Sequence, residues 1–248
     1  MLHLVSTCRK LDVGRYFIGA RDLFRVSLYL LLTALSLPAC AKTYSAKPIT
    51  ATVVDAETWE PLEGVNVVAD WQLHYPNWHG AGSLEVAEAV TDKKGQFHIP
   101  GWGPKAVPSH LPHGTRLGND DPGLVLFKSG YRIRGLSNSR QPERLLPRND
   151  IPVRYSDWNG KLIWLEKFKG TLEEYGKYIY DPAAHMGAGI PCPWKKTPRL
   201  YAALIKERER LDSLGIHNTD LPSLQAMENY FSFENCGSAR EFFREYLQ

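Results

Sequence analysis

Alternating apolar and polar positions dominate the middle of the chain. Apolar side chains fall on every second position in 49–53 and again in 65–73, and a third apolar run occupies 86–91. A period of two is typical of a β-strand that buries one face. Residues 96–100 repeat the pattern after a turn that ends in Gly95, so the sequence predicts a hairpin between the last two strands.

Two further apolar runs, 124–131 and 158–168, extend the β pattern. We expect Trp71 and Trp164 to point from their strands into the core. The intervening segment 102–123 contains four prolines and no clear alternation. It is therefore predicted to be a long loop without regular structure, of the kind that is usually functional or mobile.

Beyond the last predicted strand the period becomes helical. Leucines at helical spacing follow Thr197 and Pro198, and Gly215 marks the end of that helix. A second helix is predicted after Asp220. A third is predicted after Ser238, which begins a stretch with capping-box spacing.

Two motifs resemble a known family. The series V-x-D-x-x-T-x-x-P-L-x-G-V-x-V ends at Val67, and the series T-D-x-x-G-x-F-x-I runs from Thr91 to Ile99. Together they resemble the carboxypeptidase regulatory-like domain. The resemblance implies a transthyretin-like or Ig-like β-sandwich and a non-catalytic role in binding or scaffolding.

The first 40 residues have the layout of a secretory signal. Two arginines precede an uncharged apolar run, 26–37, that is shorter than the roughly 20 residues a transmembrane helix needs. The run leads into Leu-Pro-Ala-Cys40, which resembles the lipobox of bacterial lipoproteins. The resemblance implies that Cys40 is acylated and becomes the new N-terminus. An ordinary signal peptide that leaves Cys40 unmodified and a permanent transmembrane anchor are the alternatives.

The expected organisation is mainly β with C-terminal helices. It has three parts: a signal peptide with lipobox over 1–40, a carboxypeptidase regulatory-like β-sandwich over 47–168, and a helical C-terminal region over 169–248. The expected location is the bacterial cell envelope, lipid-anchored in the outer membrane and facing the periplasm, because Ala41 resembles the residue that follows the cysteine in proteins sent there.

The charge of the exported part limits its partners. Residues 1–40 hold five basic and two acidic side chains, so from totals of 30 and 27 the remainder keeps 25 of each. A neutral chain argues against a nucleic-acid partner, which favours a strongly basic face. The expected partners are the membrane, through the lipid, and an envelope protein or glycan.

Two cysteines, Cys192 and Cys236, remain after the signal and the lipidation candidate are set aside. In an oxidising compartment such a pair is more often a disulfide than a metal site or a nucleophile. We therefore expect a disulfide that joins the ends of the helical region.

Five side chains near predicted loops are the candidates for ligand binding: Trp78, His79, Trp102, His110 and His113. Exposed tryptophans can stack on sugar rings or peptides, which leaves a carbohydrate-binding module open as an alternative. Imidazoles can ligate metals, so a metal-dependent enzyme is a second alternative, although no carboxylate or cysteine stands at ligand spacing beside them. We expect no cofactor, no metal and no catalytic residue.

The stretch 128–154 is strongly basic. It could face anionic lipid headgroups or an acidic partner. A solvated loop whose charge is balanced elsewhere is the plainer interpretation.

Overall fold

The computed structural model describes the following residues: 42–118, 120–138, 152–180, 182, 190–217, 219–230 and 235–248. The chain divides into two compact units, 1–40 and 41–248. The described residues all belong to the second unit. The expected signal peptide and Cys40 therefore lie outside the described residues.

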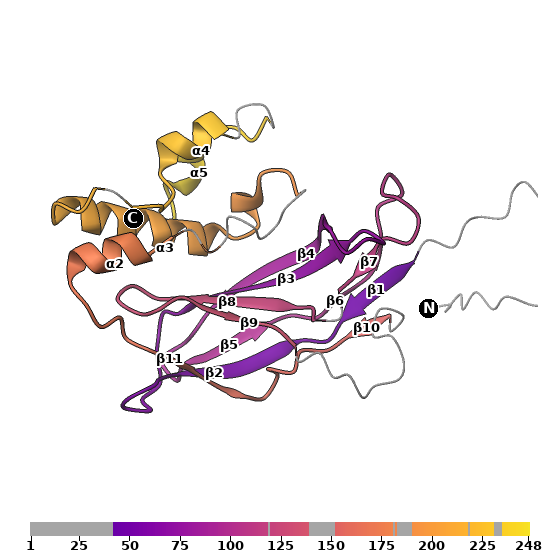
Figure 1. Cartoon of the computed structure of the whole chain (residues 1–248), viewed down its shortest axis with the longest axis horizontal. Coiled ribbons are helices and arrows are strands. Elements are labelled where there is room, and N and C mark those ends of the chain that lie inside the picture. The colour runs from indigo at the N-terminus through magenta and orange to yellow at the C-terminus, as the bar shows by residue number, and fades with distance from the viewer. Residues whose placement is uncertain are drawn as a thin grey trace, which may run out of the picture. The chain divides into compact units, whose positions relative to one another are not determined.

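The second unit is mostly β and contains three sheets (Figure 1). Sheet A has the order β10 (Val153–Arg154), β1 (Thr43–Ala46), β6 (Trp102–Ala106). Sheet B has the order β11 (Leu162–Leu165), β2 (Ile49–Asp55), β5 (Gln96–Ile99). Sheet C has the order β4 (Gly80–Val90), β3 (Asn66–His74), β8 (Gly123–Phe127), β9 (Arg134–Leu136), and the short β7 (Arg116–Leu117) also pairs with β3.

The main core lies between sheet C on one side and sheets A and B on the other. Alternate residues of β2 are buried, as its sequence pattern predicts, and they meet the inward side chains of β3 and β8. Trp71 is 1% exposed and packs edge-on against Trp102, with ring centroids 5.3 Å apart. The expectation that Trp71 belongs to the core is confirmed.

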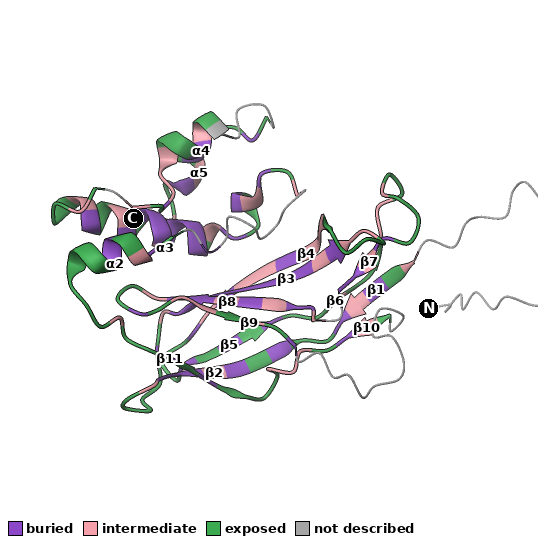
Figure 2. Cartoon of the chain, viewed as in Figure 1, coloured by how far each residue is buried: buried purple, intermediate pink, exposed green. Residues whose placement is uncertain are grey.

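Short helices cover the outer face of sheet C (Figure 2). They are α2 (Leu172–Tyr178), the 3₁₀ turn η2 (Pro193–Lys195), α3 (Pro198–Ser213), α4 (Leu224–Tyr230) and α5 (Ala239–Phe243). Val68, Val86 and Phe127 point outward from the sheet into a second buried cluster that the helices complete. The Glu88 carboxylate of β4 accepts hydrogen bonds from the first N–H groups of α3, those of Arg199 and Leu200 (3.0 and 3.1 Å).

The helix signals of the sequence are largely confirmed. α3 begins at Pro198, and Gly215 follows it with a positive φ of 86°. The Ser238 hydroxyl caps α5 by accepting from the Glu241 N–H. α2 was missed, although Thr171 and Glu174 form a complete capping box at its start.

The predicted hairpin between 86–91 and 96–100 is wrong. β4 pairs with β3 in sheet C, whereas β5 pairs with β2 in sheet B. The turn itself forms, because the Asp92 carboxylate accepts from the N–H groups of Lys94 and Gln96. However, the Gly95 carbonyl accepts from the Val53 N–H (2.8 Å), which directs the chain onto β2. Turn residues specify a local reversal but not the strand that each arm joins.

Two other expectations are corrected. The segment 102–123 is not a structureless loop, because it contains β6, β7 and the first residue of β8. Trp164 is 42% exposed instead of buried, and its neighbours Ile163 and Leu165 fill the core. All four residues of β11 are apolar, so both of its faces have apolar side chains. Alternation alone therefore does not tell which face is buried, and an assignment shifted by one residue exchanges the two faces.

The disulfide between Cys192 and Cys236 is present, with Cα atoms 5.6 Å apart and a sequence separation of 44. It joins the residue before η2 to a residue just before α5. Trp194 of η2 packs against Phe242 and Phe243 beside this link.

Candidate functional site

Four of the five predicted ligand-binding residues lie in two loops at one end of the unit. Trp78 and His79 occupy the turn between β3 and β4, and His110 and His113 lie in the loop between β6 and β7. Trp102 lies on β6 and is half-buried against the core, so it is separated from this surface.

The two loops contact each other. Gly114 lies so close to Pro76 that a Cβ on the glycine would come within 3.2 Å of the proline ring. The Arg116 guanidinium lies over the Trp78 ring, 4.5 Å from its centroid. Within the described part of the chain, no three His, Cys, Asp or Glu side chains are placed to hold a metal ion.

A second site forms where sheets B and C approach each other beyond β11. The N–H of Arg132 donates to the Glu166 carbonyl (2.8 Å), and the N–H of Phe168 donates to the Gly130 carbonyl (2.9 Å). Past this short pairing, β9 and β11 diverge into separate sheets. The Arg134 side chain bridges the opening by donating to the Trp164 carbonyl.

α2 holds this junction from outside. The Tyr175 hydroxyl accepts from the Gly130 N–H and the Tyr178 hydroxyl from the Ile133 N–H, both at 3.0 Å. Burial raises the pKa of Tyr178, so its phenol keeps its proton at neutral pH. Two helix side chains therefore fix the backbone that presents the neighbouring arginines.

Both arginines of the junction lie on aromatic rings. The Arg134 guanidinium is 4.2 Å from the centroid of the Trp164 ring. The Arg132 guanidinium is 5.2 Å from the Tyr178 ring and 5.3 Å from the Phe168 ring. Such contacts contribute about 0.5–2 kcal/mol each and orient a planar guanidinium.

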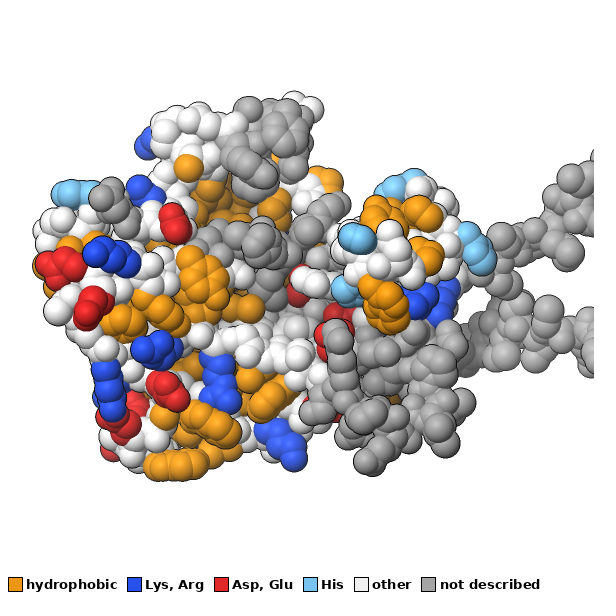
Figure 3. Space-filling view, in the orientation of Figure 1, with side chains coloured by type: hydrophobic (Ala, Val, Ile, Leu, Met, Phe, Trp, Pro, Cys, Tyr) orange, Lys and Arg blue, Asp and Glu red, His pale blue; other side chains and the backbone are white. Residues whose placement is uncertain are grey.

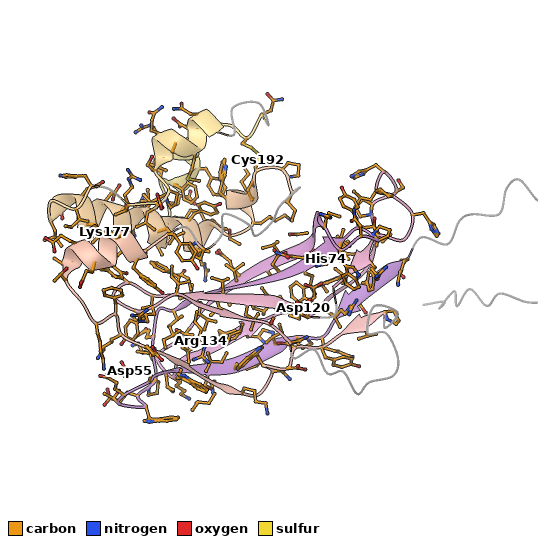
Figure 4. The ribbon with its side chains drawn as sticks, in the orientation of Figure 1. Asp55, His74, Asp120, Arg134, Lys177 and Cys192 are labelled. Atoms are coloured by element: carbon orange, nitrogen blue, oxygen red, sulfur yellow. A yellow bond between two sulfur atoms is a disulfide. The ribbon has the colours of Figure 1, made fainter. Side chains whose placement is uncertain are left out.

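A groove runs over these arginines, and we call it the seam groove. It consists of a depression of about 320 Å³ lined by Arg132, Ile133, Arg134, Trp164, Glu166 and Tyr178. A neighbouring depression of about 420 Å³ shares Arg132 and Glu166 and is also lined by Ala56, Glu57, Lys167 and Lys169. Figure 3 shows basic and hydrophobic side chains interspersed over this part of the drawn face, and Figure 4 labels Arg134 within it.

The basic residues of the groove differ in their partners. Lys167 Nζ lies 3.4 Å from the Asp55 carboxylate, and Lys169 Nζ lies 2.5 Å from that of Glu57. Arg132 and Arg134 form no ion pair with any carboxylate among the described residues. Partial burial lowers the pKa of Arg134, and the nearby Glu166 acts in the opposite direction. A guanidinium nevertheless stays charged in proteins.

The outer edge of β11 borders the groove. The carbonyls of Lys161 and Leu165 accept hydrogen bonds from the β2 side (3.0 and 2.9 Å). By alternation along a strand, the peptide groups of Leu162 and Trp164 face away from β2. β11 pairs with no strand other than β2 in the part of the chain that the structure describes.

This arrangement is suited to binding. A guanidinium offers paired N–H donors that match the two oxygens of a carboxylate or phosphate. The described residues that line the two depressions include no serine, cysteine or histidine, and Glu57 and Glu166 are their acidic members.

Sequence reasoning found only part of the seam groove. Arg132 and Arg134 belong to the basic stretch that was noted, whereas Trp164 was expected in the core. The remaining arginines of that stretch between 139 and 151 lie outside the described residues. Nothing in the local sequence shows that 130–134 meets 164–168, because that contact depends on the packing of two sheets and α2.

No protein-family model matches the chain, and a search of curated proteins finds no match. Among solved structures, 3-chlorocatechol 1,2-dioxygenase from Rhodococcus opacus 1CP is similar at 14% identity over 52% of this chain and 62% of the other, with a TM-score of 0.32. Shaft pilin SpaA from Lactobacillus rhamnosus GG is similar at 12% identity over 52% and 47%, with a TM-score of 0.24. Chlorocatechol 1,2-dioxygenase from Pseudomonas putida is similar at 13% identity over 61% and 90%, with a TM-score of 0.27. The chain thus spans less than two thirds of the first of these proteins.

None of the helices in the described residues combines the length and apolar character needed to cross a bilayer.

Proposed function

We propose that this chain is a non-catalytic, lipid-anchored protein of the bacterial envelope that binds an acidic segment of a partner protein in the seam groove. The observation that carries the proposal is the pair Arg132 and Arg134, which are oriented by aromatic rings and form no ion pair with a carboxylate among the described residues. The β11 edge beside them offers the peptide groups of Leu162 and the N–H of Trp164, whose carbonyl already accepts from Arg134, to an extended segment, a common mode of peptide recognition.

Export and anchoring are part of the same proposal. The signal-like segment and the lipobox-like Cys40 support it, and so does a disulfide in the folded part, since such bonds persist in oxidising compartments. The proposed location is the outer membrane, with the folded part in the periplasm.

We further propose that the facing sheets are a transthyretin-like sandwich of the carboxypeptidase regulatory-like kind. The motif residues support this through their roles in the fold. Asp55 accepts from the N–H groups of Glu57 and Thr58. The Thr91 hydroxyl accepts from the Val65 N–H and donates to the Leu62 carbonyl, joining both motifs.

The test of binding uses the full chain and a heptapeptide of alternating Glu and Val, titrated by calorimetry. Arg134→Gln and Arg132→Gln should each raise the Kd about tenfold, because each removes charge-assisted hydrogen bonds. Lys93→Gln is the matched control, since it removes one exposed positive charge from the turn between β4 and β5.

A heptapeptide of alternating Lys and Val should not bind. Equal binding of the two peptides, no binding of the acidic one, or unchanged Kd values in both arginine variants would contradict the proposal. N-methylation of alternate peptide nitrogens in the acidic peptide should raise its Kd for the natural protein, because it removes the N–H donors that pair with the β11 edge.

A further inference from the structure

One end of the unit lies beside the start of the described chain. The Lys42 carbonyl accepts from the Val107 N–H (2.9 Å), and Thr43 pairs with Ala106. The loop 107–115 therefore leaves the sheet beside the residue that emerges from the N-terminal segment. This loop and the adjoining turn 74–79 form what we call the anchor-side tip, at the end of Figure 1 where β1 begins.

At the tip, the ring of an exposed tryptophan, Trp78, lies against the guanidinium of Arg116. Trp78 is 52% exposed and has a positive φ of 66°. Arg116 lies against the ring at 4.5 Å, and the His74 ring is 6.2 Å from it. His79, His110 and His113 are exposed around them.

The two loops of the tip carry no acidic side chain of their own. The stretches 71–84 and 101–118, which include both of its loops, contain no Asp or Glu. They do contain Arg116 and four histidines, at positions 74, 79, 110 and 113. Lys105 is paired with the Glu85 carboxylate, and Asp120 lies beside Gly118 and His74 at the inner border of the tip. Figure 3 shows the histidines gathered there beside hydrophobic side chains. The exposed part of the tip is therefore aromatic and rich in histidine, and the Arg116 guanidinium under Trp78 supplies its positive charge.

We infer that the anchor-side tip docks on the anionic headgroups of the membrane that holds the lipid, with Trp78 at the level of the bilayer interface. The inference rests on the proposed acylation of Cys40. Two residue steps separate Cys40 from Lys42, so the tether spans at most about 7 Å. A lipid inserted in the bilayer therefore brings the Lys42 end of the unit to the surface.

The chemistry of the tip fits that surface. Tryptophan is enriched at membrane interfaces because its ring is amphipathic. A basic side chain such as Arg116 is attracted to anionic lipid headgroups. The seam groove lies elsewhere: Figure 4 separates His74, at the tip, from Asp55 and Arg134. Docking at the tip would therefore leave the groove open to the periplasm.

The experiment uses the acylated full chain in vesicles of phosphatidylethanolamine and phosphatidylglycerol whose acyl chains carry bromine, a short-range quencher of tryptophan. The natural protein should show quenching relative to vesicles without bromine. Trp78→Phe should remove most of it, and Trp164→Phe, which changes an exposed tryptophan of the groove, should leave it unchanged. Quenching that survives Trp78→Phe overturns the inference.

A second variant separates docking from mere proximity. A flexible insert of about 20 Gly and Ser residues between Ala41 and Lys42 lets the unit move roughly 25 Å from the surface. Trp78-dependent quenching should persist in this variant, and its loss would overturn the inference. A chain that fails to float with the vesicles shows that the anchor itself is wrong. A chain that floats without Trp78-dependent quenching leaves the anchor standing and refutes only the docked tip.

Discussion

Asp55 connects three parts of the chain through one buried carboxylate. It accepts from the N–H groups of Glu57 and Thr58 (2.9 and 3.1 Å) and from the Tyr131 hydroxyl (2.9 Å). Lys167 approaches the same carboxylate to 3.4 Å. The two backbone hydrogen bonds are the largest of the effects that hold the pKa of Asp55 well below its usual range. The carboxylate therefore ties the turn after β2 to the segments that build the seam groove.

We predict that Asp55 makes the protein sensitive to acid. Its folded pKa is lowered, so its contribution to stability is present above the unfolded value of about 3.9 and is lost as the pH falls further. The free energy of unfolding, measured with urea at several pH values between 7 and 2.5, should fall below about pH 5. Asp55→Asn should be less stable at pH 7 and show a shallower fall. If the free energy of unfolding of the variant fell with pH as steeply as that of the natural protein, Asp55 would not be the source of the acid sensitivity.

Asp121 should give stability the opposite dependence on pH, so that the protein becomes less stable as the pH rises. Burial raises the pKa of Asp121 to about 7, and the nearby Asp120 and Asp70 act in the same direction. Its Oδ1 accepts from the Gln72 N–H at 3.2 Å. Between about pH 4 and pH 7 the unfolded chain releases a proton that the folded chain retains, so stability falls as the pH rises.

Asp121→Asn keeps an acceptor for Gln72 and removes this cost, which is on the order of 4 kcal/mol at pH 8. The variant should therefore melt at a higher temperature than the natural protein at pH 8 and at a similar temperature at pH 4. A variant that is less stable at both pH values would show that the ionised carboxylate is favourable in the folded chain.

The strands and helices differ in how far local sequence defines them. β2 and α3 follow from alternation and from start and stop residues, since those signals lie within the element itself. The partners of β4 and β5 do not follow, because a bond from Val53 to Gly95 selects β2 across the core. The seam groove also depends on distant partners: its arginines belong to a basic stretch of the sequence, but the rings beneath them come from β11, from Phe168 after it and from α2.

The disulfide should stabilise the helical layer in particular. In the chain-entropy model, closing a loop of about 45 residues contributes about 4 kcal/mol. Cys192→Ala with Cys236→Ala should lower the free energy of unfolding by up to that amount. Hydrogen exchange should accelerate first in α4 and α5, while β2 and β3 stay protected. Equal acceleration in the strands would mean that the link supports the whole unit.

The helices cover one face of the β layers and thereby bury a strand on both sides. Six consecutive residues of β3, from Asn66 to Trp71, are buried, because one face meets the main core and the other meets the helices. Sequence alternation does not reveal this two-sided burial, because Asn66 and Asp70 give the second face a polar pattern although both are buried. In β11, by contrast, the side chains of Leu162 and Trp164 are exposed, so no element among the described residues covers the outer face of sheet B there.

Removing 169–248 should therefore damage both stability and the seam groove. The truncation exposes Val68, Val86 and Phe127, whose burial is worth roughly 2 kcal/mol each. It also removes Tyr175 and Tyr178. We expect the fragment to bind a hydrophobic dye and to aggregate on size exclusion.

The full chain with Tyr175→Phe and Tyr178→Phe is the matched control, since it keeps the apolar cover and loses only the hydroxyls that accept from Gly130 and Ile133. That variant should stay monodisperse and bind the acidic peptide more weakly. A soluble fragment that binds the peptide at full strength would show that α2 has no part in orienting the arginines.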